Sequence, residues 1–163
     1  MILSELIQRD LIKLDMQAAD KWSAIEELVD ILVAAHELRI GDRQGALDAV
    51  FERERSLSTG LEKTVAIPHG AVDFVGETLC CVGVSQNGIP FNSLDGLDAR
   101  LIVLLIIPKK SFQAHVRTLA GIARLVRVDE LRERIIAARD PDDVMETVLE
   151  LESREESRDE GGE

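Results

Sequence analysis

The clearest chemical feature of the sequence is a histidine held between a proline and a glycine. His69 follows the short β-prone run at residues 65–67, and Pro68 lacks the N–H group that a continuing strand ladder needs. Gly70 permits a positive φ angle, so we expect the histidine at a strand end, where open α/β sheets commonly bind ligands. A neutral imidazole offers a nucleophilic nitrogen at physiological pH. The alternative is a turn histidine without chemistry.

The other two histidines fall in predicted helices. His115 comes near the start of a helix that follows a buried strand. Helix N-termini attract anions because their N–H groups are free and carry partial positive charge. Taken alone, His115 is equally compatible with a surface histidine. His36 lies near the C-terminal end of the first long helix, where an imidazole interacts favourably with the helix dipole, and we assign it no further function.

Hydrophobic periodicity predicts helices in both the first and the last third of the chain. Asp20 is the expected N-cap of the first helix, and Asp140 followed by Pro141 is a typical start for the last one. The predicted helices cover residues 21–38 and 42–55, then begin again after Ser111, at Asp129 and at Pro141, the last running to about Leu151.

Short β-prone runs occupy the middle of the chain, at residues 11–14, 65–67, 78–84, 89–91 and 99–107. Asn87-Gly88 predicts a turn between the third and fourth of these runs. The run 99–107 is almost entirely apolar, as expected of a central strand covered on both faces. Strands flanked by helices predict an α/β sandwich, with a mixed β-sheet and helices on both faces.

The chain is expected to form one domain over residues 1–152, followed by an acidic tail. A length of 163 residues is enough to enclose a hydrophobic core. Residues 153–163 contain no apolar side chain and five acids against two arginines, so the sequence predicts a disordered tail.

Charge and hydropathy exclude several classes of partner. The net charge is −12, which repels nucleic acid and anionic lipid and attracts basic protein surfaces. The longest apolar run, residues 101–108, is far shorter than the roughly twenty residues that span a bilayer. No basic segment precedes the first apolar residues, so nothing reads as a signal peptide. We expect a cytoplasmic protein that does not insert into the membrane.

The sequence gives little support to a metal or a nucleotide. Cys80 and Cys81 are adjacent within an apolar run, which is typical of small core residues. A zinc site built from these cysteines and the histidines is an alternative, but zinc ligands usually come in close pairs and the histidines are widely separated. No glycine-rich phosphate loop is present. We expect no metal and no cofactor.

Two motifs in the right order resemble a known family. The first consists of residues 53–61, RERSLSTGL, followed by residues 64–70, TVAIPHG. The second consists of residues 100–108, RLIVLLIIP, followed by residues 115–125, HVRTLAGIARL. Together they resemble the fructose/mannitol/nitrogen-type enzyme IIA domains of the phosphoenolpyruvate-dependent sugar phosphotransferase system. The resemblance covers about residues 5–150.

The resemblance implies roles for individual residues. His69 corresponds to the phosphoryl-accepting histidine, His115 to the second active-site histidine and Arg53 to the active-site arginine. Thr59 lies in the loop that leads to the site, and with Gly70 it is expected to contact phosphate or partner. The sequence departs from the family at residues 62–63, which are Glu-Lys, because family members usually carry a glycine at the first of these two positions. An acid there would be unfavourable near an incoming phosphate.

Phosphoryl transfer needs in-line positioning and positive charge at the phosphoryl oxygens, and Arg53, His115 and a helix N-terminus could supply that charge. Without the resemblance, Arg53 would be an exposed charge at a helix end. Lys109 and Lys110 could add to this positive charge, although a solvated pair is the more common role of such lysines.

The resemblance implies a histidine phosphocarrier that takes phosphate from a histidine phosphocarrier protein. It would pass the phosphate to an enzyme IIB or act as a nitrogen-type regulator. The alternative function is a regulatory module of the same fold that binds partners without being phosphorylated.

Overall fold

A five-stranded mixed sheet forms the centre of the molecule in the computed structural model, which describes residues 2–161. The strands are β1 (Ile12–Lys13), β2 (Val65–Ala66), β3 (His69–Val72), β4 (Leu79–Ile89) and β5 (Ala99–Pro108). β4 and β5 form the long antiparallel pair, β1 joins β4 in parallel, and β2 and β3 both join β5 in parallel. β2 and β3 therefore follow one another along the same edge of β5.

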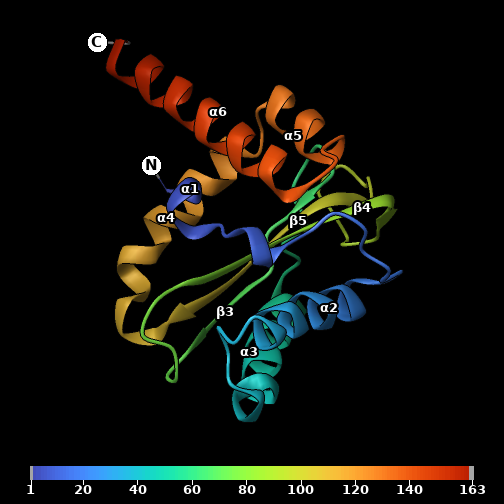
Figure 1. Cartoon of the computed structure of the whole chain (residues 1–163). Coiled ribbons are helices and arrows are strands. Elements are labelled where there is room, and N and C mark those ends of the chain that lie inside the picture. Colours follow the sequence, from blue (N-terminus) through green and yellow to red (C-terminus); the bar gives the residue numbers. More distant parts are fainter. Residues whose placement is uncertain (1, 162–163) are drawn as a thin grey trace.

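Helices cover both faces of this sheet (Figure 1). The α-helices are α1 (Leu3–Leu6), α2 (Lys21–Ala34), α3 (Arg43–Ser56), α4 (Phe112–Leu125), α5 (Asp129–Ile136) and α6 (Pro141–Gly161). Three 3-10 turns add η1 (Arg9–Leu11), η2 (Ile40–Asp42) and η3 (Lys109–Ser111). α2 and α3 lie on one face, and the remaining α-helices lie on the other. The predicted α/β sandwich is confirmed.

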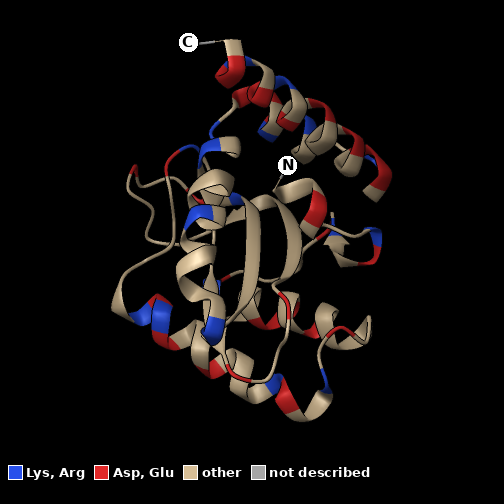
Figure 2. Ribbon diagram, turned by 90° about the vertical axis from the view of Figure 1, so that its left-hand side faces the viewer, with Lys and Arg blue, Asp and Glu red and all other residues tan. Residues whose placement is uncertain are grey.

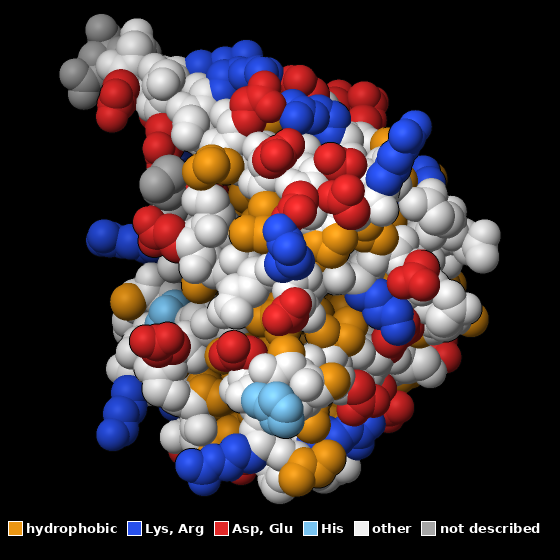
Figure 3. Space-filling model, viewed as in Figure 1, with side chains coloured by type: hydrophobic (Ala, Val, Ile, Leu, Met, Phe, Trp, Pro, Cys, Tyr) orange, Lys and Arg blue, Asp and Glu red, His pale blue; other side chains and the backbone are white. Residues whose placement is uncertain are grey.

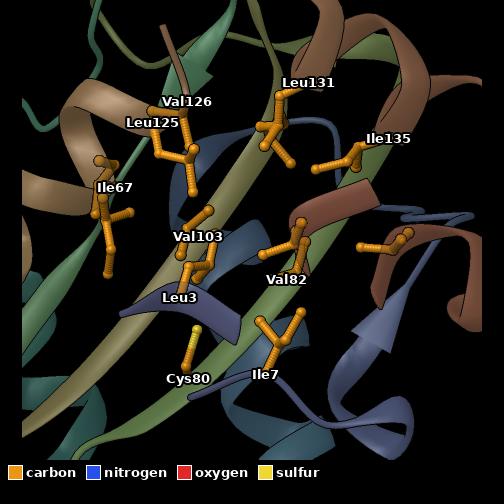
Figure 4. Close-up of a cluster of buried hydrophobic side chains, with 14 of the residues drawn as sticks. Leu3, Ile7, Ile67, Cys80, Val82, Val103, Leu125, Val126, Leu131 and Ile135 are labelled. Carbon is orange, nitrogen blue, oxygen red and sulfur yellow. The ribbon is translucent and has the colours of Figure 1, made fainter. Parts of the chain in front are cut away.

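Two hydrophobic cores result, one on each face, because neighbouring residues of a strand point to opposite sides. Cys80 packs in the core under α4, α5 and α6, whereas Cys81 packs in the core under α2 and α3. Figure 4 shows the first of these cores, in which side chains of α1 and α5 meet side chains of β4 and β5. The adjacent cysteines are both fully buried.

The expected helix caps are present, but α2 ends earlier than its periodicity predicts. The Asp20 carboxylate accepts from the Ser23 N–H at 2.9 Å, and that of Asp140 accepts from the Asp143 N–H at 3.0 Å. α2 stops at Ala34 because His36 adopts a left-handed backbone, with φ of 60°. The N–H of Glu37 then donates to the carbonyl of Leu32, as in a Schellman ending. His36 therefore ends the helix through its backbone.

Two local predictions were wrong. Asn87-Gly88 does not turn the chain back, and residues 89–91 do not form a separate strand. Instead β4 continues to Ile89 through a register shift after Val84, with Gly88 at φ of +82°. A glycine with positive φ suits a bulge as well as a hairpin turn, so the dipeptide alone does not separate them.

The acidic segment is helical, where the sequence predicted a disordered tail. α6 runs from Pro141 to Gly161, and only residues 162–163 of the predicted tail lie outside the described part. Ion pairs link α6 to α5, including Arg154 with Glu130 and Arg134 with Glu150. Figure 3 shows acidic and basic side chains interleaved over these two helices. No helix within residues 2–161 has the length and apolar character needed to cross a membrane.

Candidate functional site

The sheet edge places His69 against α3. The Pro68 carbonyl accepts from the Leu105 N–H at 3.0 Å, and His69 then begins β3 beside Leu105. His69 therefore starts a strand and does not end one, because the chain resumes pairing with β5 directly after the proline. Gly70 does not have a positive φ; its role is close packing, since a Cβ there would lie 2.8 Å from the Val50 backbone nitrogen on α3.

The imidazole of His69 is oriented by one backbone contact. Its Nδ1 lies 2.9 Å from the carbonyl oxygen of Ile67. A carbonyl oxygen only accepts, so Nδ1 carries the hydrogen in the neutral ring and Nε2 carries the lone pair. The ring is half-buried. The nitrogen available as a nucleophile is therefore Nε2.

Burial lowers the pKa of His69 from its ordinary value of about 6.5, and the nearby positive charge of Arg53 lowers it further. The hydrogen bond to Ile67 and the negative charge of Glu54 act in the opposite direction on this pKa, but more weakly in sum. A lowered pKa keeps the imidazole neutral at pH 7. The neutral ring is the nucleophilic form.

His69 and Arg53 line one open cleft of about 530 Å³. The α3 wall contributes Asp48, Glu52, Arg53 and three small residues, the β3 side contributes residues 69–74, and Lys109 and Phe112 close the opposite side. Arg53 is half-buried, and its Nη1 donates to the carbonyl of Leu57 at 2.6 Å. The cleft thus places a guanidinium and an imidazole around one space, as phosphoryl binding requires.

His115 lines a different cleft from the one that His69 lines. Its ring contacts the Thr78 hydroxyl, with Nδ1 at 2.9 Å, and it lines a second cleft of about 420 Å³. Within residues 2–161, His115 is not among the residues that line the His69 cleft. α4 and residues 73–78 border both clefts, and the bond to Thr78 turns the ring toward the second one. The two histidines therefore line different clefts, and the expected role of His115 as the second active-site histidine stays a prediction.

Thr59 is buried beneath the site and does not line the cleft. Its N–H donates to the Glu54 carboxylate at 3.1 Å, and its hydroxyl also donates to Glu54. Lys21 Nζ lies 3.2 Å from the same carboxylate, which is fully buried. The sequence did not single out Glu54, which stands among the four charged residues 52–55. The signal was available, because Glu54 lies four residues after Val50 and so continues the buried face of α3.

Glu62, the acid at the usual glycine position, is exposed and is not among the residues that line the cleft. Lys109, by contrast, lines the cleft, with its Nζ 3.8 Å from the Asp73 carboxylate. Across residues 2–161, no three His, Cys, Asp or Glu side chains gather in a way that could hold a metal ion. Burial raises the pKa of the Cys80 thiol to about 12 and also raises that of Cys81.

Comparisons with known proteins agree with this fold. The chain is 31% identical over 149 residues to the PTS system fructose-specific EIIA component of Haloferax volcanii, covering 91% of this chain and 96% of that one. It is similar to the nitrogen regulatory protein IIA-Ntr from Neisseria meningitidis, with a TM-score of 0.81, 26% identity and coverage of 91% and 99%.

Its fold also matches enzyme IIA of the mannitol system from Escherichia coli, solved in complex with phosphorylated enzyme IIB. The TM-score is 0.73 at 22% identity, with coverage of 88% of this chain and 96% of that one. The family model "Phosphoenolpyruvate-dependent sugar phosphotransferase system, EIIA 2" matches residues 5–151. The chain therefore belongs to the EIIA 2 family of the phosphoenolpyruvate-dependent sugar phosphotransferase system.

Proposed function

We propose that the protein is a phosphocarrier that accepts a phosphoryl group on Nε2 of His69. The observation that carries this proposal is the contact of His69 Nδ1 with the Ile67 carbonyl, which leaves the Nε2 lone pair available in a cleft shared with Arg53. The lowered pKa of His69 favours the neutral ring at physiological pH. Family membership supports the same chemistry.

The transfer balances without a separate base. The Nε2 lone pair attacks phosphorus as the N–P bond of a phosphohistidine donor breaks, and the bonding electrons return to the donor imidazole. The ring of His69 then carries a positive charge, and its Nδ1–H donates to the carbonyl of Ile67. The guanidinium of Arg53 stabilises charge on the equatorial phosphoryl oxygens. Transfer onward reverses these steps and restores the neutral imidazole.

The donor is a histidine phosphocarrier protein, and the acceptor is an enzyme IIB or a regulated target. The solved relative in complex with phosphorylated enzyme IIB supports a IIB acceptor, whereas the IIA-Ntr relative supports a regulatory target. Both alternatives use the same phosphohistidine. An enzyme IIB would take the phosphoryl group itself, whereas a regulated target would bind the protein according to whether His69 is phosphorylated.

The test is labelling with phosphoenolpyruvate, enzyme I and a histidine phosphocarrier protein, followed by ³¹P NMR. We expect one acid-labile phosphohistidine, substituted at Nε2, that is absent in His69→Ala. Arg53→Gln should slow labelling by about 100-fold, the typical effect of removing one charge-stabilising donor. His115→Ala should still be labelled, because His115 does not line the cleft. Labelling of His69→Ala at the wild-type level would disprove the assignment of His69 as the acceptor, whereas absence of label on the wild type would favour a regulatory module that is not phosphorylated.

A further inference from the structure

The cleft that contains His69 has more acidic than basic side chains on its walls. Three acids and two cations line it: Asp48, Glu52 and Asp73, with Arg53 and Lys109. A phosphoryl group on His69 would add about two negative charges at neutral pH. Positive charge is therefore scarce around the acceptor, and each cation of the cleft matters for how strongly a phosphoryl group is held.

The structure separates two lysines that are adjacent in the sequence. Residues 109–128, which form η3 and α4, contain five lysines or arginines and no acid, and Figure 2 shows blue but no red segments along α4. Lys109 and Lys110 both line a neighbouring cleft with residues 72–76, but only Lys109 also lines the His69 cleft. Within residues 2–161, Lys109 is therefore the one cation of this basic segment that lines the His69 cleft.

Strand pairing fixes how far Lys109 lies from the acceptor. Val72 of β3 pairs with Pro108, so Lys109 follows directly at the end of β5. His69 begins β3, three residues before Val72. A strand rises about 3.3 Å per residue, so His69 and Lys109 are about 10 Å apart along the sheet edge. Because both side chains line one cleft, the flexible stem of the lysine can reach a phosphoryl group that projects from the imidazole.

The ion pair that Lys109 makes in the unphosphorylated protein is weak. Its Nζ lies 3.8 Å from the Asp73 carboxylate, which is longer than a hydrogen bond, and the two side chains are 59% and 80% exposed. Exposed pairs of this kind contribute little to stability, because water and salt screen them. A phosphoryl group carries about twice the charge of a carboxylate and offers three acceptor oxygens. It should therefore displace Asp73 from the ammonium group.

We propose that Lys109 is a second phosphoryl-binding cation, which leaves Asp73 and binds the phosphoryl oxygens when His69 is phosphorylated. The inference rests on the proposed function, because it needs a phosphoryl group on Nε2. Arg53 donates to the Leu57 carbonyl and so offers a fixed contact, whereas Lys109 supplies a movable one. Asp73 takes the lysine back when the phosphoryl group leaves, so the ion pair alternates with the phosphorylation state.

Phosphoramidate is the phosphoryl donor for the test, because this small molecule needs no partner protein and so separates phosphoryl binding from docking. Nε2 of His69 attacks its phosphorus, the N–P bond of the donor breaks, and the bonding electrons leave with ammonia. ³¹P NMR follows both the rate of labelling and the pKa of the phosphoryl group once it is attached. A cation in contact with the phosphoryl oxygens lowers that pKa, which a merely structural role would not do.

We expect Lys109→Gln to slow labelling by about tenfold and to raise the pKa of the phosphoryl group. The effect on the rate should be smaller than that of Arg53→Gln, because water partly screens an exposed lysine. The matched control is Lys110→Gln, which removes the same charge one residue away, outside the cleft, and should behave like wild type. Both lysines are exposed, so neither variant should change the melting temperature.

A double-mutant cycle tests the exchange of partners. Asp73→Asn removes an acid from the cleft and should speed labelling in any background. In the wild type it also releases Lys109, so the gain in rate should be larger there than in Lys109→Gln. Gains of equal size in both backgrounds would show that Asp73 does not hold the lysine back, and would reject the exchange.

The outcomes distinguish this inference from the proposed function. Labelling of wild-type His69, with the same rate and the same phosphoryl pKa in Lys109→Gln, would reject the role of Lys109 alone. Equal changes in Lys109→Gln and Lys110→Gln would also reject it, because they would reflect the overall charge of the protein and not a contact. Absence of label on wild-type His69 would instead count against the proposed function itself, and this inference would fall with it.

Discussion

At the scale of single residues, the chemistry of the site depends on which form of His69 is present. The ring is half-buried, it contacts one carbonyl, and it feels the opposite charges of Arg53 and Glu54. Burial and Arg53 disfavour the imidazolium and so lower the pKa of His69. The same guanidinium that would bind phosphate therefore also keeps the acceptor neutral.

This arrangement predicts a pH profile. Labelling of wild type should stay at its neutral plateau as pH falls to 6.5 and decline only below it, since the pKa of His69 is lowered. Arg53→Gln should raise this pKa toward 6.5, which ring-proton NMR titration measures directly.

The unfolded chain takes up a proton near pH 6.5 before the folded one does, so His69 lowers the stability of the fold as pH drops through this range. A pKa of His69 above 6.5 in the wild type would contradict the prediction.

At the scale of elements, a network of hydrogen bonds connects the end of α3, the start of α2 and the loops that contain Thr59 and Asn92. Glu54 of α3 accepts from Thr59 and from Lys21, the first residue of α2. Lys21 also donates to Asn92 at 2.9 Å. Because Arg53 donates to Leu57 in the loop that Thr59 anchors, this buried network positions the guanidinium.

We predict that Glu54→Gln destabilises the protein by about 3 kcal/mol, since it leaves the mostly buried ammonium of Lys21 without its charge partner. Urea unfolding measures this loss. Removing the negative charge should also lower the pKa of His69, an effect that lost packing alone does not give. The control Glu133→Gln, at an exposed position, should change stability by less than about 0.5 kcal/mol.

A second element-scale feature is the strained turn before β2. Lys63 and Thr64 both have positive φ angles, 63° and 65°, between Gly60 and Ala66, which form an antiparallel bridge. Left-handed backbone is costly for residues with a Cβ and most of all for β-branched ones. Asn-Gly is the pair that such turns favour.

We therefore expect Lys63→Asn/Thr64→Gly to stabilise the fold by about 1 kcal/mol, because relief of strain exceeds the entropy that a glycine adds to the unfolded chain. Thermal unfolding should then show a melting temperature about 2–4 °C higher. Lys63→Ala/Thr64→Ala retains a Cβ at both positions and should give no gain. A gain of equal size in both variants would show that strain is not the cause.

At the scale of the whole molecule, hydrogen bonds connect α1, near the N-terminus, to α6, the last helix. Glu152 of α6 is buried, and its carboxylate accepts from the N–H of Leu3 at 2.8 Å and from the Ser4 hydroxyl at 2.5 Å. α1 is thereby capped from a residue nearly 150 positions away, and α6 is held against the sheet face that α4 also covers. This contact fixes α6 directly before its acidic segment begins.

Glu152→Ala should reduce the free energy of unfolding by about 2 kcal/mol, the usual contribution of hydrogen bonds to a charged group. Hydrogen exchange should become faster at the amides of Leu3 and Ser4 and in α6 after residue 152. Glu160→Ala removes an exposed acid from the same helix and should leave both measurements unchanged. Unchanged protection of α1 in Glu152→Ala would show that other contacts hold it.

Local pattern by itself determined the presence of the five longer α-helices, the strands β4 and β5, and the N-caps at Asp20 and Asp140, but not α1 or the strand β3 that His69 begins. These features depend on periodicity and on backbone preferences that neighbouring residues decide. Only the tertiary structure decided that Glu54 is buried, that Gly70 packs against α3, that His115 bonds to Thr78, and that α6 extends past Glu152. Each of these depends on a partner far away in the sequence, and the pairing of a side chain exists only once the elements that carry both partners have come together.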